Sequence, residues 1–167
     1  MNKFALLAAA AVAATAAMMA APASAQDVTN GNVYANLGYT QLDTERGDLG
    51  ALTGRLGYQF TQYLSAEGEY STGVNDSHEG KLSNAWGLYG RVGVPVTPTF
   101  EVFGRAGYQE TNIDGRNGFS DRDGQGLGYG AGVQWRPAAT GFGIRGEYTR
   151  LTDVDANAWS LAGSMTF

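Results

Sequence analysis

The 167-residue sequence contains no cysteine and only one histidine, His78. Without cysteine, the chain cannot form disulfides, zinc–thiolate clusters or redox pairs. His78 lies between Ser77 and Glu79, and three consecutive residues cannot form a serine–histidine–acid relay because their side chains point apart. A triad with a distant serine stays open, but a solvated loop histidine is favoured. The sequence therefore predicts no enzyme activity, no catalytic residue and no cofactor.

The sequence also lacks a long apolar run beyond residue 25. No later segment approaches the ~20 consecutive apolar residues that a transmembrane helix needs. Within residues 1–25, Lys3 precedes an alanine-rich apolar stretch that ends on the small residues Pro22, Ala23, Ser24 and Ala25. This order predicts a cleavable secretory signal peptide over residues 1–25, followed by one domain over residues 26–167. A retained membrane helix is the alternative interpretation.

Basic residues are scarce as well. The sequence has 11 Lys and Arg against 16 Asp and Glu; without Lys3 the balance is 10 against 16, a formal charge of −6. An acidic chain of this kind argues against nucleic acid as a partner. Asp114, Asp121 and Asp123 lie in one polar segment, but they lack the spacing and the terminal glutamate of an EF-hand. A turn-rich loop is therefore favoured over a metal site.

What the sequence does have is period-two alternation of apolar and polar residues. Eight segments show it, each of roughly the length that a tilted strand needs to cross a membrane. They are residues 33–39, 52–60, 64–72, 86–94, 100–108, 127–135, 142–148 and 159–167. Eight amphipathic strands predict an all-β fold, an eight-stranded antiparallel up-and-down transmembrane β-barrel.

Four arginines and four glutamates lie on the polar face of these segments, near mid-strand. Each of them would cost about 2–4 kcal/mol on a lipid-facing surface, so we expect the polar face to point inward. Opposite charges could then pair in a neutral ion network. Glycines on the same face, at 126, 128, 130 and 132, are expected to leave room for large side chains opposite them. The expected network consists of Arg55, Glu67, Glu69, Arg91, Glu101, Arg105, Arg145 and Glu147.

The connections and the aromatic residues suggest how the barrel is oriented. Short connections at 61–62, 95–98 and 137–140 alternate with longer polar ones at 43–49, 74–82, 111–125 and 152–155, as in a membrane barrel whose two termini lie on the short-turn side. Aromatics on the apolar face fall into two bands, which is typical of the two interfaces of a bilayer. The outer band holds Tyr39, Tyr70, Trp86, Tyr108, Tyr148 and Trp159. The other band holds Tyr58, Phe60, Phe100, Trp135, Phe142 and Phe167.

With these features the chain resembles the small OmpA-like and OmpX-like family of eight-stranded outer-membrane barrels over its whole mature length. The likeness rests on the eight alternating segments, the turn asymmetry and the last strand, which ends on Phe167. In this family such a strand looks like the signal that the outer-membrane assembly machinery reads, here Trp159, Leu161, Met165 and Phe167. The resemblance implies periplasmic termini, periplasmic chaperones during biogenesis, contact with outer-membrane lipid and lipopolysaccharide, and a monomer. No residues are left for a peptidoglycan-binding domain, so cell-wall anchoring is not expected.

The expected function is a structural, surface-exposed barrel with a polar interior and four acidic outer loops. An eight-stranded barrel is just wide enough for its own side chains, which disfavours a permanent pore. A narrow porin and an adhesin or surface antigen stay open, as does a soluble periplasmic ligand-binding barrel with its apolar face inward. Arg150 falls in the outward phase of the seventh strand, where it could contact a lipopolysaccharide phosphate or extend to water.

Overall fold

The computed structural model describes residues 31–44, 47–75, 80–115, 122–137, 141–152 and 155–167. The predicted signal peptide, His78 and Asp121 lie outside the described residues, so the interpretations made for them remain predictions. Within the described ranges, no helix is long and apolar enough to pass through a membrane.

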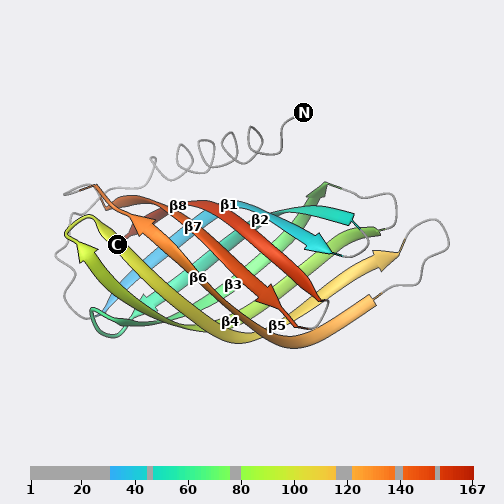
Figure 1. Ribbon diagram of the computed structural model, residues 1–167, viewed down its shortest axis with the longest axis horizontal. Coiled ribbons are helices and arrows are strands. Elements are labelled where there is room, and N and C mark those ends of the chain that lie inside the picture. Colours follow the sequence, from blue (N-terminus) through green and yellow to red (C-terminus); the bar gives the residue numbers. More distant parts are fainter. Residues whose placement is uncertain (1–30, 45–46, 76–79, 116–121, 138–140, 153–154) are drawn as a thin grey trace.

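Eight strands form one closed barrel (Figure 1). Each strand is antiparallel to the next along the chain, and β8 pairs with β1 from Tyr34↔Thr166 to Asp43↔Asn157. This confirms the predicted fold class. The strands are β1 (Asn32–Thr44), β2 (Gly47–Gln59), β3 (Leu64–Asn75), β4 (Gly80–Thr97), β5 (Phe100–Gly115), β6 (Arg122–Trp135), β7 (Phe142–Leu151) and β8 (Ala156–Thr166).

The period-two pattern decides which side chains face outward. On β2, Leu52, Leu56 and Tyr58 are exposed, whereas the alternating Thr53 and Arg55 are buried. The interpretation as a soluble barrel with its apolar face inward is therefore wrong, because the charged face is the buried one. Two residues in the outward phase, Tyr39 and Met165, are nevertheless buried, with exposed fractions of 8% and 1%.

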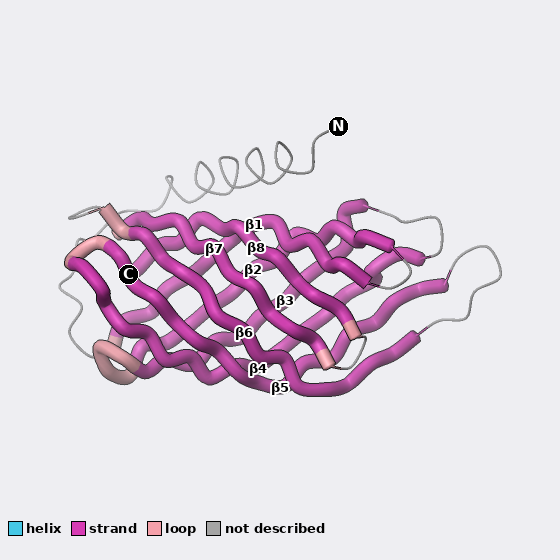
Figure 2. The backbone as a smooth tube through the Cα atoms, in the orientation of Figure 1, coloured by secondary structure: helices cyan, strands magenta, loops and turns pink. Residues whose placement is uncertain are grey.

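The strands run farther than the apolar alternation predicts. Most of the tube in Figure 2 is coloured as strand. Strands β4 and β5 contain 18 and 16 residues, more than the corresponding segments expected from sequence. Parts of the expected loops are paired, as in Thr44↔Gly47, Gly80↔Gly115 and Ile113↔Arg122. Apolar alternation is needed only where the outer face is apolar, whereas the backbone ladder can continue with polar side chains.

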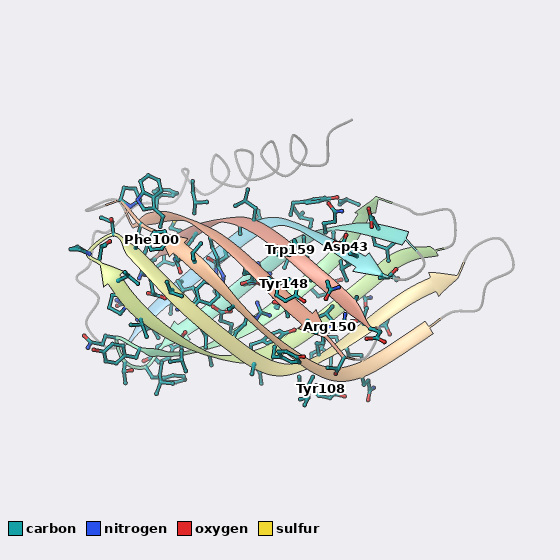
Figure 3. The ribbon with its side chains drawn as sticks, viewed as in Figure 1. Asp43, Phe100, Tyr108, Tyr148, Arg150 and Trp159 are labelled. Atoms are coloured by element: carbon teal, nitrogen blue, oxygen red, sulfur yellow. The ribbon has the colours of Figure 1, made fainter. Side chains whose placement is uncertain are left out.

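Outward aromatic residues form bands at two heights. Figure 3 shows Phe100 near one end of the barrel and Tyr108, Tyr148 and Trp159 toward the other. The Tyr148 and Trp159 rings lie 4.7 Å apart on paired strands, and those of Trp86 and Tyr108 lie 6.4 Å apart. Exposed leucines and valines lie between the two aromatic bands. The outer surface therefore has an aliphatic belt with aromatic edges, which matches the hydrocarbon core and the two interfaces of a bilayer.

A charge in the middle of this surface should destabilise the folded barrel. Leu88 on β4 is 62% exposed and lies on the outward face. We expect Leu88→Arg to lower the free energy of unfolding by about 2–4 kcal/mol in lipid vesicles, because an arginine must leave water for hydrocarbon. Urea titration followed by tryptophan fluorescence measures the change, with Leu88→Ala as the control for lost volume. A Leu88→Arg variant as stable as the control would contradict a lipid-facing Leu88.

Candidate functional site

The candidate site is the barrel interior, which is built in layers. We call the end at which residues 60–64 and 97–100 connect the strands the turn end, and the opposite end the loop end. From the loop end inward there are an apolar plug, a layer of hydroxyl groups and an ion network. The apolar plug comprises Leu42, Leu49, Ala51, Leu151, Ala156 and Ala158. The hydroxyl layer comprises Thr40, Thr53, Ser71, Thr111, Thr149 and Ser160.

Glu147 lies at the centre of the ion network. Its carboxylate accepts hydrogen bonds from Arg55 at 2.7 Å, from Arg105 at 2.9 Å and from Arg145 at 2.8 Å. Glu69 joins two of the same arginines, at 2.6 Å from Arg55 Nε and 2.8 Å from Arg105 Nη2. Each carboxylate is thus shared between arginines from different strands, which satisfies several donors where bulk water is scarce.

Glu67 extends the network toward the turn end. Arg145 donates to both of its carboxylate oxygens, at 2.6 and 3.0 Å, and the Tyr34 hydroxyl donates to one of them at 2.6 Å. Arg91 Nε and Arg105 Nη1 lie 3.6 and 3.8 Å from the same carboxylate. The bidentate Arg145 contact fixes the geometry of two fully buried side chains.

A fifth arginine belongs to this network and was not expected. Glu101 accepts from Arg91 and, at 2.8 Å, from Arg136, which lies directly after β6. The described interior therefore holds five arginines and four glutamates, one arginine more than the expected network. Arg136 shares the inward phase of Gln134, but it follows the last apolar position of its segment, so the alternation gave no signal for it. Its side chain is 26% exposed at the turn end.

Two aromatic rings fill the spaces between the charges. The guanidinium of Arg105 lies 3.5 Å from the ring centroid of Tyr89, and those of Arg91 and Arg145 lie 4.2 and 4.4 Å from Phe103. At these distances the rings attract the cations as well as occupying volume.

Of the four inward glycines expected to leave room for large side chains, Gly128 and Gly132 do so for these rings, whereas a Cβ at Gly130 would meet the Tyr148 carbonyl and Thr149. A Cβ at Gly128 would lie 2.7 Å from the Tyr89 hydroxyl, and one at Gly132 would lie 2.5 Å from Phe103 Cζ. On the outward face, a Cβ at Gly90 or Gly104 would meet nothing closer than 3.8 Å. Only the inward glycines are therefore required by the packing of the barrel itself.

The apolar plug is the main feature that the sequence analysis missed. The interior was expected to be polar throughout, but Leu42, Leu49 and Leu151 point inward at the loop end and are buried. They lie in the same inward-facing phase as Thr40, Arg55 and Thr149. The sequence pattern predicts outer loops or strand ends at these positions. Extending the period-two alternation beyond the apolar segments would have predicted these inward leucines.

A cavity of about 30 Å³ lies between the ion network and the apolar plug, enough for one or two water molecules. No group of His, Asp and Glu side chains in the described part of the chain could hold a metal ion. The arrangement can bind water and exchange ion-pair partners, but it presents no reactive group to a substrate.

The remaining predicted site residues belong to the outward phase of β7 and β8. Trp159 and Phe167 are exposed, Leu161 is half-buried and Met165 is buried, all in one phase of β8 and its end. Arg150 is half-buried at the loop end of β7 (Figure 3) and forms an ion pair with Asp155. Its Nη1 donates at 3.0 Å to Asn157, which also accepts from the Tyr148 hydroxyl at 2.7 Å.

Comparison with known proteins agrees with this architecture. The family model described as outer membrane protein beta-barrel domain matches residues 7–167. No curated protein sequence matches the chain.

Several solved structures share the fold. Ail of Yersinia pestis, crystallised with the heparin analogue sucrose octasulfate, is 19% identical with a TM-score of 0.61, covering 83% of this chain and 100% of that chain. The N-terminal β-barrel domain of Pseudomonas aeruginosa OprF is 18% identical with a TM-score of 0.64, covering 83% and 98%. Pseudomonas aeruginosa OprG is 16% identical with a TM-score of 0.57, covering 86% and 99%.

Removal of the central carboxylate should destabilise the barrel strongly. We expect Glu147→Gln to lower the free energy of unfolding by about 3–5 kcal/mol, because three buried arginines lose a shared counter-charge. Glu110→Gln is the matched control, since Glu110 lies at the loop end and, among the described residues, accepts a single side-chain hydrogen bond, from the exposed Gln125 at 3.3 Å; its effect should stay within about 0.5 kcal/mol. Urea unfolding in vesicles compares the two variants, and equal effects would contradict a coupled network centred on Glu147.

Proposed function

This chain belongs to the outer membrane protein β-barrel domain family, and we propose that its role in the outer membrane is structural and surface-exposed. On this proposal the barrel fills the membrane with a closed interior and displays the polar hairpins of its loop end outside the cell.

The filled interior is the observation that carries this proposal. The cavity between the ion network and the apolar plug has a volume of only about 30 Å³. A permanent pore would need a continuous water-filled path, and the ion network and the apolar plug both cross that path. A narrow porin is the second candidate, because carboxylates shared by several arginines could exchange partners and open a transient path.

The proposal includes no catalysed reaction. The described residues contain no histidine, and the buried carboxylates are engaged by arginines instead of facing a substrate pocket. A fold of this kind supports many functions, so the interior chemistry has to decide between them, and here it is the chemistry of a filled core.

The charge of the loop end restricts its partners. The four longer connections expected from sequence hold ten acidic and four basic residues. Ail was crystallised with a sulfated sugar, but a polyanion of that kind would be repelled by this acidic surface. If the protein acts as an adhesin or surface antigen, its partner should therefore present a basic surface.

We propose that Arg150 contacts lipopolysaccharide. The apolar outward face of the barrel contacts the surrounding outer-membrane lipid. Asp155 and Asn157 hold the guanidinium at the loop end, beside the rings of Tyr148 and Trp159. This arrangement orients the remaining guanidinium donors, although the ion pair with Asp155 reduces the net attraction for a phosphate. Extension of Arg150 to interfacial water fits the same geometry.

For biogenesis, we propose that the assembly machinery reads Trp159, Leu161, Met165 and Phe167 after periplasmic chaperones deliver the chain. The backbone N–H of Phe167 donates to the carbonyl of Val33 at 2.8 Å, so the last residue lies beside β1, where the barrel closes. Periplasmic termini and a monomeric barrel are part of the same proposal.

A closed barrel should not conduct ions. We expect planar bilayers containing the folded wild-type protein to show no single-channel events above those of protein-free bilayers, because no continuous water path crosses the interior. The folded state is verified by a gel-mobility shift between unheated and boiled samples. Reproducible conductance steps would reject the closed barrel and support the narrow porin.

The terminal aromatic should matter for assembly more than for stability. We expect Phe167→Ser to reduce the heat-modifiable protein in the outer-membrane fraction several-fold, while the purified barrel keeps its urea midpoint. The backbone bond to Val33 does not depend on the side chain. Phe60→Ser is the matched control, since Phe60 is also an exposed aromatic at the turn end. If both variants assemble like the wild type, Phe167 is not the assembly signal.

A further inference from the structure

The cavity beneath the apolar plug contains a polar atom that lacks a partner. The cavity is lined by Thr149, Thr111, Ser71 and Ser160 from the hydroxyl layer and by Leu151 and Ala158 from the plug. The Thr149 hydroxyl is buried, and it forms no hydrogen bond with any described residue. Buried hydroxyls are almost always hydrogen-bonded, to protein or to ordered water. The size of the cavity and the free hydroxyl together match a bound water molecule.

Other buried polar atoms without a hydrogen-bond partner lie on the same side of the plug. Both side-chain polar atoms of Asn36 and the Nε atoms of Arg91 and Arg105 are buried and make no hydrogen bond within the described ranges. They lie level with the ion network or closer to the turn end, as the register of Asn36 with Arg55 shows. The interior below the plug therefore has several places where water would find partners, whereas the plug residues offer no side-chain donor or acceptor.

The two layers that close the barrel differ in how they can respond to water. In the ion network, Glu147 contacts three arginines and Glu69 contacts two, so partners can exchange while each charge stays paired. Leu42, Leu49 and Leu151 make no such exchangeable contacts, and water that enters between them forms no side-chain hydrogen bond. A narrow apolar constriction excludes water for this reason and blocks ions even without complete steric closure.

We propose that the interior holds ordered water beneath the plug, with one site at the Thr149 hydroxyl, and that the apolar plug is the barrier that keeps this water separate from the outside. The inference rests on the proposed function as a closed barrel and assigns its closure to the plug. On this proposal, rearrangement of the ion network alone produces no ion conductance, because any water path that it opens ends at the apolar plug.

The water site is tested by solution NMR on methyl-labelled protein in micelles. The methyl groups of Leu151 and Ala158 should show cross-relaxation with a long-lived water, since both line the cavity. The isosteric variant Thr149→Val should abolish these cross-peaks while the remaining methyl spectrum stays unchanged. Absence of the cross-peaks in the wild type, or their survival in Thr149→Val, would overturn the water site.

The barrier is tested by two double variants of matched volume. Leu42→Asn with Leu151→Asn makes the plug polar at similar size, and Leu42→Met with Leu151→Met keeps it apolar. With heat-modifiable, folded protein in planar bilayers, we expect at least about tenfold more single-channel events from the asparagine pair than from the methionine pair, which should match the wild type. A folded asparagine pair as silent as the methionine pair would overturn the plug as the barrier. Conductance by the wild type would instead reject the closed barrel itself, so the two failures are distinguishable.

Discussion

The pairing of β8 with β1 is the constraint on which the rest of the structure depends. Hydrocarbon offers no hydrogen-bond partner to a strand edge, so a sheet in a membrane must close on itself. Ten register pairs between these strands complete the ladder. Once the barrel is closed, the side-chain period of two forces every second residue inward, and the interior of eight strands becomes narrow enough that those residues must satisfy one another.

The interior meets this requirement in a different way at each height. Near mid-barrel, large charged side chains from several strands meet, and the four glutamates and five arginines share contacts instead of forming isolated pairs. Tyr89 and Phe103 separate the charges, and Gly128 and Gly132 supply the space that these rings occupy. Toward the loop end, small and aliphatic residues of the first hairpin and of β7 and β8 pack against each other. These apolar side chains need no polar partners.

The sequence predicted most reliably what repeats. All eight strands and the eight mid-strand charges follow from the period of two, because lipid outside and charge inside penalise any slip of register. Arg136 and the apolar plug lie beyond the lipid-facing segments, where a slip of register carries no such penalty. The outward residues there are polar, so the alternation of apolar and polar residues vanishes although the inward phase continues. Which arginine pairs with which glutamate is also not a property of any one strand, since Arg145 and Glu67 are 78 positions apart in the sequence.

A barrel whose interior is committed to its own packing has little freedom to evolve a function there. Substituting one charge disturbs several partners, because each network carboxylate is shared by two or more arginines. Ail, OprF and OprG share this fold at 16–19% identity. Under the proposed function, the acidic hairpins would carry the partner specificity, while the network around Glu147 and the apolar plug fill the barrel that displays them.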